Sequence, residues 1–227
     1  MKIVVAVRCR NEEKNIERFL HGYDFADSIV VSDGGSTDNS VSLLKRNGKV
    51  ILHHFTEEET VGGETWNLDA PHMNFVLNKA KELEPDWVIF DDLDCAPNKR
   101  LRDRARTLLS VAQFDYLQVN AFRLYLWGDS EFFPKMNNYF KEGWTSLWAW
   151  RPSKINITAD ESVRHGTMIG LSATPYSIEI PMCLLHKSWH PDTIEKKVVR
   201  YNALGLNMDS PLDFAGKPEP LPDWAHE

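Results

Sequence analysis

Residues 86–98 read DWVIFDDLDCAPN, an apolar segment that ends in a group of aspartates. The run from Trp87 to Phe90 is typical of a strand buried on both faces, because such strands read as short, continuous apolar segments. Asp91, Asp92 and Asp94 follow it almost at once. Carboxylates this close repel one another, so we expect a positively charged group among them.

Three further segments rich in β-branched residues precede this strand: residues 2–7, 28–32 and 49–54. Helical segments separate the strands, and Asn11 suits the N-cap of the first helix. Alternating strands and helices predict a mostly parallel sheet with helices on both faces. Ligands of such sheets bind beyond the carboxyl ends of the strands, where residues 8–11, 33–36 and 91–94 stand. We therefore expect these three polar clusters to meet at one sheet edge.

The second half of the chain alternates less regularly. A helix with a basic start is expected at 99–112, and a final helix at 191–205. Between them we expect long strands, rich in aromatic residues, at 115–128, 146–152 and 176–185. From residue 206 the chain is rich in proline and acidic residues, which is typical of a tail that lies on the surface or is disordered.

The composition excludes several classes of protein. Hydrophobic residues at 42% and charged residues at 26% are typical of a globular domain, and a net charge of −7 argues against a wholly basic, nucleic-acid-binding surface. The cysteines, which are odd in number and far apart, form neither a disulfide framework nor a zinc motif, and this favours a reducing, cytoplasmic setting. No segment has the length of a membrane span or of a signal peptide.

Two polar clusters carry residues that suit a metal and a nucleotide. Asp92 and Asp94 are one residue apart, so in an extended segment they point the same way and suit Mg²⁺ or Mn²⁺, which prefer oxygen ligands. Asp33 can accept hydrogen bonds from a base or a ribose, and the paired glycines after it allow a ligand to approach closely. The alternative in each case is a plain turn, with the carboxylates as solvated or capping groups.

In combination, VVAVRCRNEEKNIERFL, DSIVVSDGGSTDNSV and DWVIFDDLD resemble the nucleotide-binding half of the inverting family 2 glycosyltransferases, which have the GT-A fold. GWTSLWAWRP and CLLHKSWHPDTIEKKVVRY resemble the family more loosely. The resemblance implies a single domain at 1–205, in which 1–98 bind the nucleotide sugar and 99–205 form the acceptor half and a closing segment. A proline-rich acidic tail would follow at 206–227.

The resemblance also implies a set of residues that bind the donor: Arg8, Asn11, Glu12, Asp33, Asp92, Lys197 and Arg200. Asp33 would recognise the nucleobase, and Lys197 and Arg200 would neutralise the leaving diphosphate. One departure concerns an Arg-Asn pair on the helix before the D-x-D strand, where this chain has Met73 and Asn74. His72 or another basic residue would then contact the phosphates.

For the metal, the resemblance implies Mn²⁺ or Mg²⁺ held by Asp92, Asp94 and His186, with His190 as a nearby substitute. The family's D-x-D is often followed by Glu, and here Cys95 stands in that place. This departure removes no metal ligand, but it weakens the transfer of detailed substrate contacts.

An inverting displacement also needs a general base on the acceptor hydroxyl. We expect Asp160 or Glu161 in that role, with Asp129 and Glu131 as rivals, and a surface carboxylate is an equal alternative for each. Among the eight tryptophans, core packing is expected for one or two of the group Trp127, Trp144, Trp148 and Trp150, and Trp148 and Trp150 are expected to share one face of a strand. Trp144 is expected to contact the acceptor, because sugar rings stack well on indoles.

Two other functions compete with this prediction. A nucleotidyltransferase also holds a nucleotide and a metal on an α/β sheet, but it would need a glycine- and lysine-rich phosphate loop, which AVRCRNEE lacks. A non-catalytic carbohydrate-binding module accounts for the tryptophans but not for Asp92 and Asp94. The sequence thus predicts metal-dependent transfer of a hexosyl or pentosyl group from a UDP-, GDP- or similar donor. The acceptor would be a glycan, lipid, protein or modified nucleobase.

Overall fold

The computed structural model describes residues 1–61, 64–111, 118–121, 123–133, 146–162, 168–169, 176–178, 182–189, 195, 198–199, 202 and 217–226. Within this part of the chain, strands and helices alternate as far as residue 111, and strands predominate after it. No helix in it has the length and apolar character needed to cross a membrane.

The first part of the chain contains the predicted alternation of strands and helices, with three additional strands. Its strands are β1 (Ile3–Cys9), β2 (Ser28–Asp33), β3 (Val50–His54), β4 (Glu58–Val61), β5 (Glu64–Asn67), β6 (Trp87–Asp92) and β7 (Cys95–Pro97), of which β4, β5 and β7 are the additional ones. Its helices are α1 (Glu13–Gly22), α2 (Ser40–Leu44), α3 (Asp69–Lys81) and α4 (Lys99–Val111). The antiparallel hairpin of β4 and β5 was not predicted, because acidic residues interrupt its hydrophobic pattern.

Short strands dominate the second part. They are β8 (Gln118–Ala121), β9 (Arg123–Trp127), β10 (Glu131–Phe132), β11 (Ser146–Trp150), β12 (Thr158–Ala159), β13 (Met168–Ile169), β14 (Tyr176–Ile178), β15 (Leu184–Trp189) and β16 (Glu219–Pro220), followed by helix α8 (Asp223–His226). The single strands predicted at 115–128 and 176–185 are wrong, because each segment forms two short strands that pair in different sheets. The predicted final helix at 191–205 lies mainly outside the described residues.

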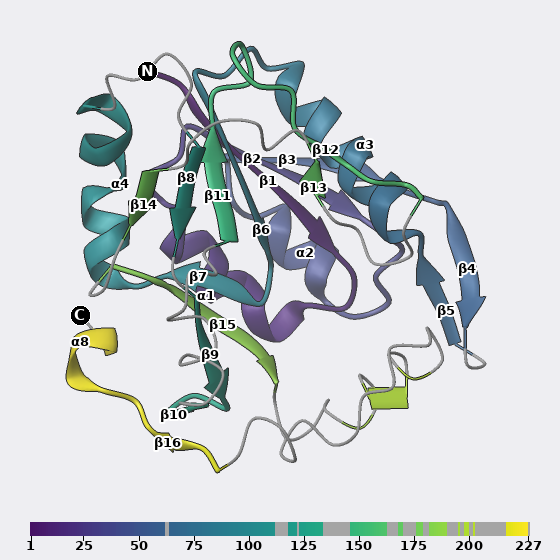
Figure 1. The fold of residues 1–227 in the computed structure, drawn as a ribbon. Coiled ribbons are helices and arrows are strands. Elements are labelled where there is room, and N and C mark those ends of the chain that lie inside the picture. Colours follow the sequence, from purple (N-terminus) through teal and green to yellow (C-terminus); the bar gives the residue numbers. More distant parts are fainter. Residues whose placement is uncertain are drawn as a thin grey trace.

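The central sheet has the strand order β14-β8-β11-β6-β1-β2-β3 in the described part of the chain (Figure 1). The neighbours from β6 to β3 are parallel, whereas β11 is antiparallel to both β6 and β8. The sheet is therefore mixed, with mostly parallel pairing. This arrangement confirms the predicted α/β class with helices on both faces of a central sheet.

Two hydrophobic clusters cover the two faces of this sheet. Alternate residues of β1 point to opposite sides, so Val5 and Val7 pack with α1 and α4, whereas Val4 and Ala6 pack with α3. The residues of β1 from Ile3 to Val7 are all fully buried, as expected for a strand covered on both faces. The middle of the central sheet is therefore covered on both faces.

Trp148 and Trp150 are both fully buried, which agrees with core packing of one or two of these tryptophans, but the prediction that they share one face of a strand is wrong. Trp148 belongs to the cluster with α1 and α4, and Trp150 belongs to the cluster with α3. The register of β11 against β8 shifts between Leu147 and Ala149. This irregularity breaks the two-residue alternation that places residues i and i+2 on the same face.

A second sheet has the order β16-β10-β9-β15-β7 and lies beside the carboxyl ends of the central strands (Figure 1). Its strand β15 is parallel to β9 and antiparallel to β7. Gly22, at the end of α1, allows that helix to approach β7, because a Cβ atom there would lie 3.0 Å from Pro97 Cδ. Strand β16 pairs with β10, and Ala225 of α8 is buried, so residues 219–226 pack on this sheet.

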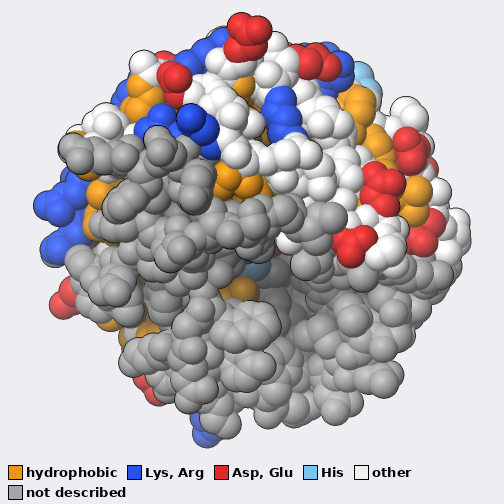
Figure 2. All heavy atoms as spheres, turned by 45° about the horizontal axis from the view of Figure 1, so that its top comes forward, with side chains coloured by type: hydrophobic (Ala, Val, Ile, Leu, Met, Phe, Trp, Pro, Cys, Tyr) orange, Lys and Arg blue, Asp and Glu red, His pale blue; other side chains and the backbone are white. Residues whose placement is uncertain are grey.

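Charged side chains are distributed unevenly over the surface. Figure 2 shows Lys and Arg side chains along the left edge, the side on which Figure 1 places α4. It shows Asp and Glu side chains along the right edge, the side of the β4–β5 hairpin. The basic residues of α4 thus lie on its exposed face, and the apolar residues of the helix are buried on the opposite face.

Candidate active site

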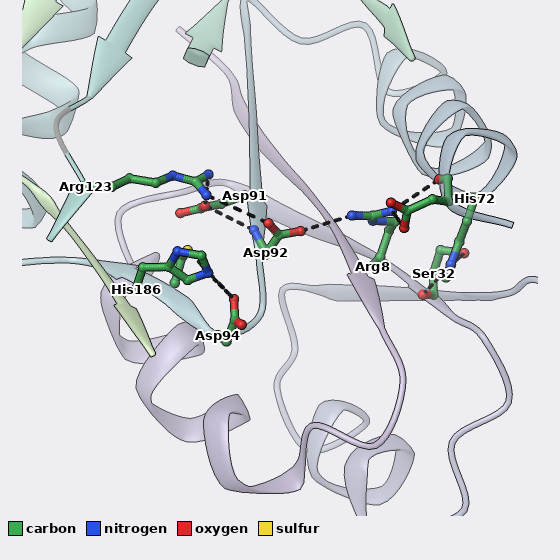
Figure 3. Close-up of polar contacts among 10 residues, drawn as sticks. Arg8, Ser32, His72, Asp91, Asp92, Asp94, Arg123 and His186 are labelled. Atoms are coloured by element: carbon green, nitrogen blue, oxygen red, sulfur yellow. Dashed lines mark hydrogen bonds and ion pairs between the residues drawn. The ribbon is translucent and has the colours of Figure 1, made fainter. Parts of the chain in front are cut away.

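The carboxyl ends of β1, β2 and β6 lie side by side. Their pairing places Cys9 opposite Asp33 and Arg8 opposite Asp92. The predicted convergence of the three polar clusters on one sheet edge is thereby confirmed. Figure 3 shows the side chains that meet at this edge and in the adjoining second sheet.

Asp91 is fully buried, and its charge is balanced inside the protein. Arg123 Nη2 lies 3.0 Å from Asp91 Oδ1, and the Tyr23 hydroxyl donates to Oδ2 at 2.5 Å. The indole N–H of Trp148 donates to the same hydroxyl at 3.1 Å. Burial raises the pKa of the Asp91 carboxyl, while Arg123 and the Tyr23 hydroxyl act in the opposite direction. Asp91 therefore fixes the end of β6 through its contacts with Arg123 and Tyr23.

Asp92 lies between two arginines (Figure 3). Its Oδ1 is 3.2 Å from Arg8 Nη2, and its Oδ2 is 3.9 Å from Arg123 Nη1. Arg8 also contacts the Asp69 carboxylate, at the start of α3, at 2.6 Å. The two arginines are positive groups of the kind that the aspartate cluster was expected to require. Because the Asp92 side chain is 37% exposed, it can also contact a ligand.

Asp94 has a different environment from Asp92, because a turn at residues 93–94 separates it from β6. The two carboxylates were expected to point the same way along an extended segment, and this expectation is wrong at the turn. Asp92 faces the arginines, whereas Asp94 Oδ1 lies 3.2 Å from His186 Nε2 (Figure 3).

His186 is brought to Asp94 by the second sheet. In β15 it pairs with Cys95 of β7 and with Tyr125 of β9, whose ring centroid lies 4.8 Å from the imidazole. One ligand atom from each of Asp94, Cys95 and His186 lies within 4.8 Å of the others. His186 Nδ1 is buried and has no hydrogen-bond partner among the described residues. The Nε2 atom faces the Asp94 carboxylate, and Nδ1 is the unsatisfied nitrogen. Imidazole nitrogen and carboxylate oxygen are both common ligands of divalent metal ions.

Cys95 contributes a sulfur atom to this cluster, the softest of its three possible metal ligands. Burial raises the pKa of its thiol well above the usual value, and the Asp91 charge acts in the same direction. The sulfur is thus a neutral thiol, 3.8 Å from Asp94 Oδ1. Asp92 lies outside this cluster of ligand atoms in the described structure.

Asp33 supports the loop that follows β2. Its carboxylate accepts hydrogen bonds from the backbone N–H groups of Gly35 and Ser36, each at 3.2 Å, and the residue is only 2% exposed. Gly35 has a φ of +85°, a conformation that favours glycine. The turn that was the alternative for Asp33 is present, and contact with a nucleobase stays a prediction.

Asn11 and Glu12 hold the same loop from the side of β1. Asn11 was predicted as the N-cap of α1, but that helix begins at Glu13 with Glu12 in the N-cap position. Asn11 instead has a φ of +56°, and its Oδ1 accepts a hydrogen bond from the Thr37 N–H at 2.7 Å. The Glu12 carboxylate accepts a hydrogen bond from Asn15 at 2.7 Å. Lining of a donor pocket by Asn11 and Glu12 stays a prediction.

The candidate general bases lie in two places. Asp160 and Glu161 follow β12, which Asn74 of α3 holds by hydrogen bonds at 2.7 Å and 3.1 Å to the backbone of Ala159. The Glu161 carboxylate also accepts a hydrogen bond from Asn74 at 2.8 Å. Asp129 instead forms an ion pair with Lys187 beside the second sheet.

His72 does not supply positive charge to the site, contrary to one of the alternatives. It is buried, its Nε2 lies 2.8 Å from Ser32 Oγ, and its ring stacks on Phe55 at 4.4 Å. Burial, together with the charge of Arg8, lowers the pKa of His72 to about 4. The imidazole is therefore neutral at physiological pH.

Several predicted residues lie outside the described residues: Trp144, His190, Lys197 and Arg200. The sequence interpretation also missed residues that build the site, namely Tyr23, Asp69 and Arg123. A signal for Arg123 is present, because it is a lone charge in the apolar segment AFRLYLW, and a charge in a buried strand needs a buried partner. No comparable signal marks Asp69, which pairs with a residue 61 positions earlier.

Comparison with solved structures supports the fold class. The chain matches a crystal structure of S. aureus TarS 1–349 in complex with UDP at a TM-score of 0.54, with 16% identity over 92% of this chain and 68% of that one. It matches a second crystal structure of S. aureus TarS 1–349 at a TM-score of 0.54, with 17% identity over 92% of this chain and 66% of that one. With a longer crystal structure of S. aureus TarS, the TM-score is 0.54 and the sequence identity is 17%. That match covers 92% of this chain and 40% of the TarS chain.

At this level of identity the likeness shows the fold, and it confirms the GT-A-like class predicted from the sequence. No protein-family model matches the chain, and no curated protein matches it.

Proposed function

We propose that the chain is a glycosyltransferase that transfers a sugar, with inversion, from a nucleotide-diphosphate donor to an acceptor hydroxyl, with Mn²⁺ or Mg²⁺ as cofactor. The observation that carries the proposal is the convergence of Asp33, Asp92 and Asp94 at one edge of a GT-A-like sheet. The fold likeness to TarS, which was crystallised with UDP, makes a uridine nucleotide the first donor to test.

In this proposal the nucleoside binds over the loop after β2. Asp33 would orient the glycine-containing turn and accept a hydrogen bond from the base, and Asp92 would contact the ribose or the metal. Its support is the pairing of β1 with both β2 and β6, which keeps Asp33 and Asp92 one strand apart on either side of Arg8. Ligands of parallel α/β sheets bind at such strand ends.

The diphosphate would lie toward the second sheet. Departure of a nucleoside diphosphate is accelerated by positive charge near its oxygens. Arg8 and Arg123 offer two guanidinium groups that flank Asp92 at 3.2 Å and 3.9 Å. Asp94 and His186 would hold the divalent cation, which would supply further positive charge to the phosphates when bound.

For the general base we propose Asp160 or Glu161 ahead of Asp129. Both follow β12, which Asn74 attaches to α3, and the first turn of α3 carries the Asp69 partner of Arg8. Asp129 is instead paired with Lys187. The acceptor would be a glycan, lipid, protein or modified nucleobase, and the sugar a hexose or a pentose.

Nucleotide binding with and without Mn²⁺ tests the proposal. Calorimetric titration with UDP and GDP is expected to show binding that Mn²⁺ strengthens. Asp94→Asn should weaken Mn²⁺-dependent binding at least about tenfold, because loss of a direct ligand should cost no less than loss of a group that supports one. Asp103→Asn is the matched control, since Asp103 is an exposed aspartate of α4 that pairs with Lys99.

Equal affinities in wild type and Asp94→Asn would remove Asp94 from the metal site. A response to free sugars without any response to nucleotides would instead favour a carbohydrate-binding module. Turnover of a UDP-sugar panel, followed by mass spectrometry of the products, then identifies the sugar and tests inversion through the configuration of the product.

A further inference from the structure

A cavity lies on the other side of the Asp94 peptide from the proposed donor site. Its volume is about 410 Å³, and its described lining comes from the end of α1, the start of α4, strands β7, β9 and β15, and the segment around α8. The Asp94 carbonyl oxygen accepts hydrogen bonds from Arg18 Nη2 at 2.5 Å and from the Lys187 N–H at 2.7 Å. Both of these residues line the cavity, so the Asp94 backbone separates it from the Asp94 carboxylate and His186.

The cavity has an excess of cationic side chains. Its lining includes Arg18, Lys99, Arg102 and Lys187, together with His21. Two carboxylates are paired with these cations in the described structure, one within the lining and one beside it. Asp129 pairs with Lys187, and Asp103 lies 2.6 Å from Lys99 and 3.2 Å from Arg102.

Arg18 has the least compensation among these cations. Its guanidinium donates to two backbone carbonyls, those of Asp94 and, at 3.1 Å, Leu185. Its Nε is buried and has no hydrogen-bond partner among the described residues. No carboxylate lies within ion-pair distance of it in the part of the chain that the structure describes. The charges of Asp94 and Asp91 act on Arg18 without a direct ion pair, and an anion in the cavity would supply a direct one.

Two more features fit an anion that is attached to an organic group. The start of α4 lines the cavity through Asn98 and Lys99, and the N-terminus of a helix favours negative charge. The lining also includes apolar residues, among them Pro97, Leu126 and Leu221. A volume of this size is in the range of small-molecule sites, which combine apolar walls with a few charged groups.

We propose that this cavity binds a small phosphorylated ligand, whose phosphoryl group contacts the cationic side chains and whose organic part lies against the apolar wall. Arginine suits this role, because its planar guanidinium binds phosphate oxygens through paired hydrogen bonds. The site is separate from the donor site and does not depend on the proposed glycosyltransferase activity.

Calorimetric titration with inorganic phosphate and with glucose 1-phosphate tests the site. Arg102→Gln and Lys99→Gln should each raise the dissociation constant of the phosphorylated probe, by about tenfold for the arginine, because hydrogen bonds to charged groups contribute strongly. Lys99 is largely exposed, so its substitution keeps the fold intact. Arg106→Gln is the matched control, since Arg106 lies on the same helix but pairs with Asp27 outside the cavity.

A second control separates this cavity from the donor site. Saturation of the donor site with UDP and Mn²⁺ should leave phosphate binding within about twofold of its value without them, a difference well below that of one charged hydrogen bond. Tighter binding of glucose 1-phosphate than of phosphate would identify organic phosphates as the ligands, and equal binding would identify the free ion. The proposal is overturned if the wild type shows no saturable binding, if Arg106→Gln weakens binding as much as Arg102→Gln, or if UDP with Mn²⁺ abolishes it.

Discussion

Asp91 and Asp94 are separated by one turn, but they have opposite electrostatic surroundings. Asp91 is fully buried and contacts an arginine and a tyrosine hydroxyl, so its charge is balanced within the fold. Asp94 lies in the turn before β7 and faces the imidazole of His186 at 3.2 Å. The comparison shows that a row of aspartates can combine a structural anion with a candidate metal ligand. Proximity in the sequence alone does not assign these roles.

The largest effect is expected when the arginine side of this comparison is broken. Asp91→Asn leaves Arg123 buried without its closest carboxylate, at 3.0 Å in the native protein. Removal of one partner from a buried ion pair costs about 3–5 kcal/mol of unfolding free energy. Urea unfolding, followed by circular dichroism, measures this loss. A loss below about 1 kcal/mol, the range of exposed pairs, would show that Asp91 does not anchor β6.

Two histidines extend the comparison, since His72 lies on the arginine side and His186 on the other. Burial, with the charge of Arg8, lowers the pKa of His72 from its ordinary value of 6.5 to about 4. The unfolded chain therefore binds a proton below pH 6.5, whereas the folded protein does so only near pH 4. This contribution to stability is complete above pH 6.5 and is lost as the pH falls toward 4.

The expected size of that loss is about 3 kcal/mol, since each unit of pKa shift corresponds to about 1.4 kcal/mol. His72→Gln should reduce the difference in urea stability between neutral and acidic pH by nearly this amount. His53→Gln is the matched control, because His53 contacts the Phe75 ring and forms no ion pair with any described residue. An unchanged pH dependence in His72→Gln would mean that His72 is not held neutral by its surroundings.

A third carboxylate, Asp33, sharpens the comparison, because it is buried like Asp91 but contacts backbone N–H groups instead of arginine. If it also accepts a hydrogen bond from a uracil, Asp33→Asn should weaken UDP binding by about 1–3 kcal/mol, through loss of an acceptor in a buried site. Calorimetry with UDP measures this change. Matching affinities in wild type and variant would mean that Asp33 only stabilises the turn after β2.

The smallest effect on stability is expected at Asp92, although it is adjacent to Asp91, where the largest effect is expected. Its side chain is 37% exposed between Arg8 and Arg123, and exposed ion pairs contribute only about 0–1 kcal/mol. Asp92→Asn should therefore lower the unfolding free energy by less than about 1 kcal/mol, the upper end of that range. The same urea experiment used for Asp91→Asn compares the two directly. Equal losses would mean that burial does not distinguish the two positions.

Local patterns were sufficient to predict the parallel half of the fold. The apolar run before Asp91 and the alternation of strands and helices indicated a sheet edge with three polar clusters, and the structure has that edge. The pattern failed at β11, where a register shift separates Trp148 from Trp150, and at residues 115–128, which divide between two sheets. Strand period and propensity carry no information about such shifts.

The site residues divide in the same way. Asp92 stands at a strand end and could be found from topology. The role of Arg123 depends on a contact with Asp91 across 32 residues, and that of His186 depends on the pairing of β15 with β7. These contacts are set by tertiary packing. A single sequence therefore offers an isolated charge or imidazole as the only sign of them.

The buried chain of contacts from Arg123 through Asp91 and Tyr23 to Trp148 also has a consequence for the order of folding. Its last hydrogen bond joins residues 125 positions apart. During synthesis, Asp91 has no arginine partner from this chain of contacts until residue 123 has left the ribosome, and the Tyr23 hydroxyl gains its indole donor later still. Contacts between distant residues form slowly, because the entropy of closing long loops must be overcome first. We therefore expect that residues 1–98, although they carry all three strand-end clusters, do not fold as an autonomous unit.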